Sequence, residues 1–337
     1  MKKGLLELDA EILSAASVVG QKEYDGPIGS CFDLHGDDDR FGQKTWEKAE
    51  SEMQRLALNT ALAKGEFSEG DIGALFAGDL LNQCIGSAYG LIDFNIPYFG
   101  LYGACSTAAE GLLLASAMVS AGFETRTCAV TSSHNCSAER QYRTPIEYGG
   151  QRPQTAQWTV TGSGAFVVGR TTGRGLARVT GGMPGIVVEK GITDANNMGA
   201  AMAPAAANTL RRYFEATGDK PGDYDCILTG DLGYEGGSIL CDLLLIDGID
   251  IRGVYADCGQ IIYDREAQDM HAGGSGCGCS AVVLASYFLP RIKRGDLRRI
   301  LFLGTGAMMS PDSIKQGGAI PGIAHLLRLE TGGKERG

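Results

Sequence analysis

Apolar residues recur at every third or fourth position between Thr45 and Lys64, which predicts one buried face of an amphipathic helix. Thr45 is expected to cap the start of this helix, and Gly65 is expected to follow its last turn. The next apolar run, at residues 72–77, is short and continuous, as in a buried strand of a parallel sheet. A helix followed by such a strand predicts an α/β protein.

The same order of elements occurs twice along the chain. Each half contains an apolar strand ending in Gly-Asp, a glycine-rich turn that opens a helix, and a further strand. The expected segments are 72–79, 103–121 and 126–132 in the first half, and 208–217, 226–231, 237–246, 271–294 and 299–303 in the second. Chance similarity could explain either the repeated strand-Gly-Asp segment or the repeated glycine-rich turn by itself. Because both recur in the same order, duplication is favoured. The predicted halves are residues 1–170 and 171–337, joined in one compact body.

Composition and charge narrow the class of protein. The chain has 337 residues, 44% of them hydrophobic and 21% charged, as in ordinary folded globular proteins. A net charge of -10 argues against a nucleic-acid partner and against direct adsorption to an anionic membrane. Glu7, Asp9 and Glu11 interrupt the first apolar residues, so no signal peptide is predicted, and no run reaches the ~20 apolar residues of a membrane span. Any membrane association is therefore expected to depend on partner proteins.

The ten cysteines are expected to be reduced and largely buried, because they form no CxxC pair and no export signal precedes them. Cys277 and Cys279 are separated by one residue, which is the wrong spacing for a zinc knuckle. The sequence predicts neither a metal site nor a cofactor.

Candidate chemistry gathers at the expected carboxyl ends of the strands, where free N–H groups at helix starts can hold a ligand. Cys105 sits in a small-residue turn at the start of a helix, where the dipole favours a thiolate. It is interpreted as a nucleophile or part of an anion site, the alternative being a small buried side chain. His134 and His271 are better placed as a base than His35 and His325, although either could be an ordinary loop imidazole.

Charged residues complete the predicted site. Asp79 and Asp231 each follow a buried strand, and their paired position makes them candidates for one shared pocket. Arg140, Arg143 and Arg152 form the dense cationic group near these loops, suited to binding carboxylates.

Several segments together resemble the stage V sporulation protein AD family, from about Gly26 to the C-terminus. They are residues 77–83 (AGDLLNQ), 103–107 (GACST), 131–135 (TSSHN), 138–140 (AER), 159–164 (TVTGSG), 202–207 (MAPAAA), 228–232 (LTGDL) and 273–276 (GGSG). The resemblance implies the thiolase fold, with two duplicated βαβαβ-type halves in a five-layered body. It also implies a protein of endospore-forming bacteria that binds dipicolinic acid, alone or as its calcium chelate, within the spore uptake machinery. The expected location is cytoplasmic or forespore, peripheral at the spore inner membrane through membrane-embedded partners of the same operon, and a homodimer is expected by analogy.

The resemblance also assigns site residues. Cys105 matches the nucleophile of condensing enzymes with this fold, residues 303–306 resemble their late glycine loop, and Asp231 stands where they carry a histidine. The expected ligand-binding residues are Cys105, Asp79, Asn82, Ser132, Ser133, His134, Asp231, Gly274 and Thr305. A carboxylate in place of a base opposes thiolate formation, so binding without catalysis is predicted. The alternatives are an acyltransferase using Cys105 and His271, and a scaffold with a vestigial pocket.

Overall fold

The main sheet contains the same five-strand arrangement twice, joined edge to edge. The computed structural model describes residues 4–142 and 152–332. The strands of the first half are β1 (Leu6–Val19), β3 (Ala74–Gly78), β4 (Tyr98–Gly100), β5 (Arg126–Ser133) and β7 (Gly162–Gly169). Those of the second half are β8 (Ala177–Met183), β9 (Cys226–Thr229), β10 (Tyr255–Asp257), β12 (Arg299–Ala307) and β13 (Gly322–Glu330).

The strand order reads β4-β3-β5-β7-β1 in one half and continues as β8-β13-β12-β9-β10 in the other. In each half three strands are parallel, and the last two are antiparallel. Antiparallel pairing of β1 with β8 joins the halves. The predicted duplication is confirmed, whereas the boundary at residue 170 stays a prediction.

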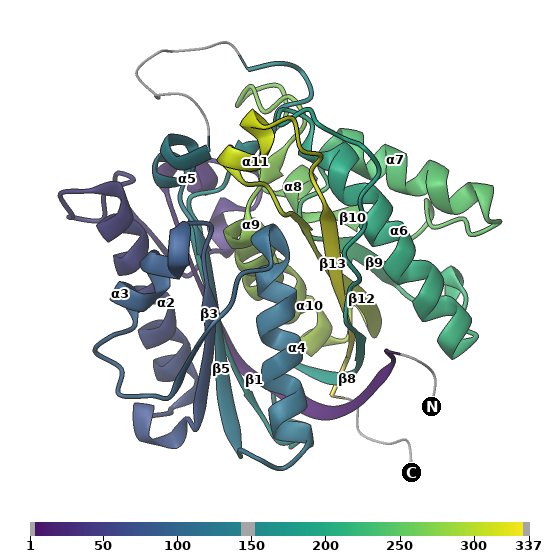
Figure 1. The fold of residues 1–337 in the computed structure, drawn as a ribbon. Helices are drawn as coiled ribbons and strands as arrows, with labels where there is room; N and C mark the ends of the chain where they lie inside the picture. The colour runs from purple at the N-terminus through teal and green to yellow at the C-terminus, as the bar shows by residue number, and fades with distance from the viewer. Residues whose placement is uncertain (1–3, 143–151, 333–337) are drawn as a thin grey trace.

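Helices cover the two half-sheets in three layers (Figure 1). The helices that form the layers are α2 (Trp46–Gly65), α4 (Thr107–Ser120), α6 (Met198–Thr217), α7 (Gly233–Ile246), α9 (Cys277–Val283) and α10 (Leu289–Arg294), the last two being linked by a π-helical turn. The other helices are α1 (Gln21–Tyr24), α3 (Ile85–Gly90), α5 (Asn135–Tyr142), α8 (Cys258–Ile261) and α11 (Pro311–Lys315). In Figure 1, α2 lies outside the first half-sheet, α4, α9 and α10 lie between the half-sheets, and α6 and α7 lie outside the second. The predicted five-layered α/β architecture is confirmed.

Three apolar cores lie between these layers. Met53 and Leu58 of α2 pack on the first half-sheet, and Met202 and Leu210 of α6 pack on the second. The central core surrounds α4 and α9, with Leu112 as one of its fully buried members. Burial of whole aliphatic side chains contributes about 1.5–3 kcal/mol each, so these three cores fix the positions of the central helix starts.

Local differences from the predicted elements have physical causes. The residues that interrupt the apolar N-terminus alternate with apolar ones, so this segment forms the 14-residue β1 and not a loop. Helix α6 begins at Met198, ahead of the predicted residue 208, although Pro204 lies inside it. The predicted helix 271–294 begins only at Cys277, because Gly274–Ser275 (β11) pairs with Trp158–Thr159 (β6). Strand β2 (Leu34–His35) adds to the edge of β1.

The parallel strands β3, β5, β9 and β12 end near the starts of α4 and α9, and this end of the molecule holds the candidate site. Within residues 4–142 and 152–332, the helices are all too short or too polar to span a bilayer.

Candidate functional site

Cys105 lies in a tight turn that packs against a glycine of strand β12. The turn is a 3-10 helix, Ala104–Ser106, and Ala104 has a left-handed backbone with φ of 51°. Gly306 of β12 packs directly against this turn, because a Cβ there would lie 2.4 Å from the Gly103 oxygen. The glycine segment 303–306 predicted as a late loop therefore lies at Cys105 but as part of strand β12, and glycine is needed at 306 for close backbone approach.

Asp231 lies immediately after β9 and is held toward Cys105 by four hydrogen bonds. Its Oδ1 accepts from Thr305 Oγ1 at 2.7 Å, and its backbone N–H donates back to that hydroxyl at 3.1 Å. Its Oδ2 accepts from Ser275 Oγ and from the Gly276 backbone N–H, both at 2.9 Å. Ser275 Oγ lies 3.9 Å from the Cys105 sulfur. Three of the predicted residues, Cys105, Asp231 and Thr305, are thus brought together.

The electrostatics of this group favour a protonated thiol. Burial raises the pKa of Cys105 well above its usual value, and the charge of Asp231 and its hydrogen bond with the thiol raise it further. Burial also raises the pKa of Asp231, while its hydrogen bonds from Thr305 and Gly276 lower it. A helix start alone would favour a thiolate, but burial and a neighbouring carboxyl group outweigh it here.

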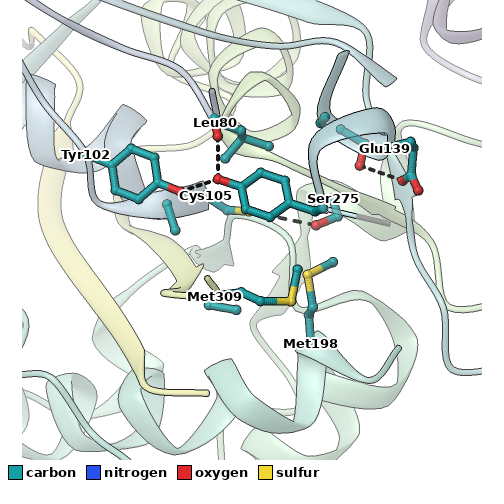
Figure 2. A pocket seen from close by; sticks show the side chains of 12 residues that line it. Leu80, Tyr102, Cys105, Glu139, Met198, Ser275 and Met309 are labelled. Carbon is teal, nitrogen blue, oxygen red and sulfur yellow. Dashed lines mark hydrogen bonds between the residues drawn. The ribbon is translucent and has the colours of Figure 1, made fainter. Parts of the chain in front are cut away.

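A pocket opens over Cys105 at the junction of the two halves (Figure 2). It has about 40 Å³ of space that a water-sized sphere can reach. At about 10–15 Å³ per water, this is room for a few waters, so a larger ligand requires side chains to move. The lining residues are Leu80, Tyr102, Ala104, Cys105, Ala138, Glu139, Tyr142, Thr159, Met198, Ser275, Ala307 and Met309.

Two tyrosines and two methionines are the largest apolar groups of the pocket wall. The Tyr142 hydroxyl donates to the Leu80 carbonyl at 2.5 Å and lies 2.5 Å from the Tyr102 hydroxyl, which consequently donates to it. In Figure 2, Tyr102 and Leu80 lie on one side of Cys105, with Met198 and Met309 on the other. Such a wall suits the faces of a flat ring.

One acidic side chain also faces the pocket. Glu139 of α5 accepts a hydrogen bond from Thr159 Oγ1 at 3.1 Å. Among the described lining residues there is no arginine, lysine or histidine. The described part of the pocket wall therefore includes one carboxylate.

Asp79 does not line this pocket, which corrects the expectation of a shared site with Cys105. Its Oδ2 accepts from the Ser87 backbone N–H at 2.7 Å and from the Ser87 hydroxyl at 2.6 Å, and its Oδ1 accepts from the Leu81 N–H. Burial raises its pKa. The aspartates at the two strand ends occupy equivalent places in the sequence, but only Asp231 faces Cys105.

Ser132 and Ser133 have hydroxyls that are already engaged elsewhere. Ser132 Oγ donates to Glu50 Oε1 at 2.9 Å and accepts from Gln54 at 2.7 Å. Ser133 Oγ donates to the Val160 carbonyl at 2.7 Å. Neither residue lines the pocket, so the structure does not place their hydroxyls toward a ligand there.

Asn82 and Gly274 lie near the site without lining the pocket. Asn82 is exposed, and its backbone N–H donates to Gln141. Gly274 is buried in the β6–β11 pair, and its carbonyl accepts from Gln157 at 3.0 Å. Gly274 thereby helps to position the adjacent Ser275.

The two candidate histidines are both committed to structural contacts. His134 Nε2 bonds the Asp39 carbonyl at 2.7 Å, its Nδ1 accepts from the Cys136 N–H, and burial lowers its pKa. His271 contacts the Pro153 carbonyl through Nδ1 and Asp269 through Nε2, both at 3.0 Å. Neither lines the pocket, so neither is placed to act as a base for Cys105.

Two of the expected arginines, Arg140 and Arg152, are likewise not among the described lining residues of the pocket. Arg140 pairs with Glu47, and Arg152 donates to Asp269 while its guanidinium lies over Trp158. Arg143 lies outside the described residues.

Sequence reasoning missed most of the pocket wall. Two of the missed residues could have been found from the sequence. Ser275 follows the predicted ligand-binding residue Gly274, and Glu139 lies inside the family segment 138–140. Tyr102, Met198 and Met309 could not, because their apolar side chains fit the pattern of ordinary core positions.

Solved structures with the same fold cover almost the whole chain. A variant of OleA from Xanthomonas campestris matches with a TM-score of 0.61 at 17% identity, covering 96% of this chain and 99% of that one. A 3-oxoacyl-[acyl-carrier-protein] synthase III from Aquifex aeolicus matches with a TM-score of 0.56 at 13% identity, covering 95% and 99%. The predicted thiolase-like fold is confirmed.

Sequence comparison gives the family. A profile of the stage V sporulation protein AD (SpoVAD) family matches residues 2–330. Stage V sporulation protein AD of Bacillus subtilis (strain 168) is 46% identical over 320 residues, covering 95% of this chain and 94% of the relative. The chain therefore belongs to the stage V sporulation protein AD family.

Proposed function

We propose that this sporulation protein binds dipicolinic acid in the pocket beside Cys105 and does not transfer acyl groups. The observation that carries the proposal is the contact of Cys105, which lines the pocket, with the buried Asp231 behind it, while the described pocket lining contains no imidazole. A buried thiol beside a carboxyl group stays protonated, and a protonated thiol is a poor nucleophile. The fold thus keeps a ligand pocket without the means to activate its cysteine.

The described lining has groups that suit the calcium chelate of dipicolinate. A dianion needs donors or cations, since burying an unpaired carboxylate costs several kcal/mol. The described lining instead presents the acidic Glu139, together with tyrosine and methionine side chains that can cover a pyridine ring. Calcium binds carboxylate oxygens readily, so Glu139 is the residue proposed to face the metal of a bound chelate.

The remaining parts of the proposal rest on membership of the family. They are a role in dipicolinate uptake, a position at the spore inner membrane, and membrane-embedded partners from the same operon. The acyltransferase alternative has less support, because His271 contacts Pro153 and Asp269 instead of Cys105.

Protection of Cys105 from alkylation tests the proposal. Dipicolinate with calcium is expected to slow the reaction of Cys105 with iodoacetamide, measured by peptide mass spectrometry, while the exposed Cys31 serves as the internal control. Equal rates at Cys105 with and without ligand would count against binding there. Acyl-CoA is expected to leave no adduct on Cys105, and an adduct that turns over would support the acyltransferase instead.

A further inference from the structure

A second, larger pocket lies at the end of the molecule opposite Cys105. It contains Arg126, the first residue of β5, whereas the last residues of β5 lie toward the candidate site. Its volume is about 710 Å³. The lining residues are Leu13, Gly65, Glu66, Phe67, Thr125, Arg126, Arg170, Thr172, Arg174 and Gly175.

Three arginines from separate segments converge on this pocket. Arg126 pairs across the sheet with Gly169, which places the next residue, Arg170, beside Thr125. Arg174 comes from the loop between β7 and β8, which joins the two halves of the fold. Among the described lining residues Glu66 is the only acidic one, and it is exposed at the end of α2.

These arginines have few acceptors of their own. Within the described ranges, no hydrogen bond or ion pair is formed by the guanidinium of Arg170 or Arg174. Arg126 lies over the Phe67 ring at 4.9 Å and reaches Asp71 only at 3.9 Å. Three convergent cations repel one another, so an anion placed between them would lower the electrostatic energy of their arrangement.

A buried carboxylate shapes the loop that carries Arg174. Glu11 is fully buried, and its Oε2 accepts from the Thr172 N–H at 2.6 Å, the Thr172 hydroxyl at 2.7 Å and the Gly173 N–H at 3.1 Å. Its Oε1 accepts from the Gly175 N–H at 2.9 Å. The loop is therefore held in place before any ligand arrives, which reduces the entropy cost of binding.

We infer that the pocket lined by Arg126, Arg170 and Arg174 binds phosphate or carboxylate oxyanions of a molecule that carries at least two such groups. Guanidinium groups donate pairs of hydrogen bonds that match these oxyanions, and Thr125 adds a hydroxyl to the wall, whereas the Thr172 hydroxyl is engaged by Glu11. The inference is independent of dipicolinate binding beside Cys105, because the two pockets share no lining residue.

Titration calorimetry with inorganic pyrophosphate tests this site. The test variant is Arg170→Ala/Arg174→Ala, whose altered residues are exposed and leave Glu11 and its loop contacts intact. The control is Arg252→Ala/Arg294→Ala, which removes two exposed arginines that each pair with a nearby aspartate. Pyrophosphate is expected to bind at least tenfold more weakly to the test variant than to the wild type or control, and more weakly in high salt.

Two further arms identify the source of the oxyanion. Sedimentation with cardiolipin vesicles, compared with neutral phosphatidylcholine vesicles, tests a lipid headgroup. If the test variant loses binding to cardiolipin vesicles but binds pyrophosphate like the control, the site is assigned to lipid. The inference is overturned if neither pyrophosphate nor cardiolipin distinguishes the test variant from the control. Dipicolinate protection of Cys105 in the test variant reports separately on the first pocket.

Discussion

Asp231 and Cys105 share a serine: Ser275 donates its hydroxyl proton to Asp231 Oδ2 at 2.9 Å and lies 3.9 Å from the Cys105 sulfur. The two residues come from opposite halves of the duplicated fold, at the end of β9 and the start of α4. Because the carboxyl group raises the pKa of an already buried thiol, this relationship separates the pocket from that of a cysteine nucleophile.

Replacing Asp231 by Asn is expected to make Cys105 more reactive. The change removes the negative charge that disfavours the thiolate but keeps a side chain that can accept from Thr305. We expect alkylation of Cys105 at pH 8 to become several-fold faster, with a lower apparent pKa in a pH–rate profile measured by mass spectrometry. The rate at Cys31 should stay unchanged. An unaltered pKa at Cys105 would mean that burial alone, and not Asp231, holds the thiol protonated.

The repeated strand-Gly-Asp order predicted the duplication, because it reflects the turn that ends a buried parallel strand. It could not predict where each aspartate points. Asp79 is turned away by donors from Ser87 and Leu81, while Asp231 is held inward by Thr305 and Gly276. These partners come from loops whose conformations are set by tertiary packing, which a single sequence does not encode locally.

Replacing Gly306 by Ala is expected to destabilise the protein by about 1–3 kcal/mol through overpacking. A Cβ there would lie 2.4 Å from the Gly103 oxygen and 3.0 Å from the Ser106 nitrogen, so the Cys105 turn would have to move. Urea unfolding measures the change in free energy. The matched control is Gly253→Ala, because a Cβ at Gly253 meets no atom within 4 Å. Equal stability of the two variants would show that the turn tolerates displacement.

The contribution of Glu23 to the free energy of unfolding is expected to fall as the pH rises from about 4.5 to about 7. Burial raises the pKa of Glu23 from its usual 4.5 to about 7, although hydrogen bonds from Tyr263 and Thr161 lower it. A raised carboxyl pKa gives stability that is complete below the unfolded value and lost as the pH rises through the folded value. The contribution of Glu23 is roughly 3 kcal/mol at most.

Glu23→Gln removes this titration while keeping an oxygen for Tyr263 and Thr161 to donate to. Its unfolding free energy should therefore lose less between pH 5 and pH 8 than that of the wild type, as measured by urea unfolding at each pH. Burial also raises the pKa of Glu50 to about 8 and that of Asp257 to about 7. The variant should therefore still lose some unfolding free energy as the pH rises. Glu69→Gln, at an exposed position, is the control. Equal slopes in the Glu23 variant and the wild type would contradict the assignment.

The homodimer expected from the sequence stays a prediction, and β4 is where we expect it to form. This strand is at one edge of the main sheet, and its Tyr98 and Phe99 side chains are 40% and 47% exposed. Tyr98→Lys should convert a dimer to a monomer in light scattering, because charge on an edge strand opposes strand pairing. A wild-type chain that is already monomeric would contradict this expectation.

The candidate site was harder to predict than the fold for a physical reason. Hydrophobic periodicity reports burial, and a pocket wall made of Tyr102, Met198 and Met309 has the same periodicity as a core. Ser132, Ser133 and His134, which are polar residues of one motif, have structural contacts instead of facing the pocket. Their side chains form hydrogen bonds with Glu50, Val160 and Asp39, respectively.

Calorimetric titration of dipicolinate, with calcium and with a chelator, tests the central claim most directly. The wild type should bind in the presence of calcium, and Ala138→Phe, which fills the pocket, should bind at least tenfold more weakly. Glu139→Gln should lose the calcium-dependent part of the affinity, while Glu69→Gln should match the wild type. Undiminished binding to Ala138→Phe, or no binding to the wild type in either condition, would contradict a dipicolinate site beside Cys105.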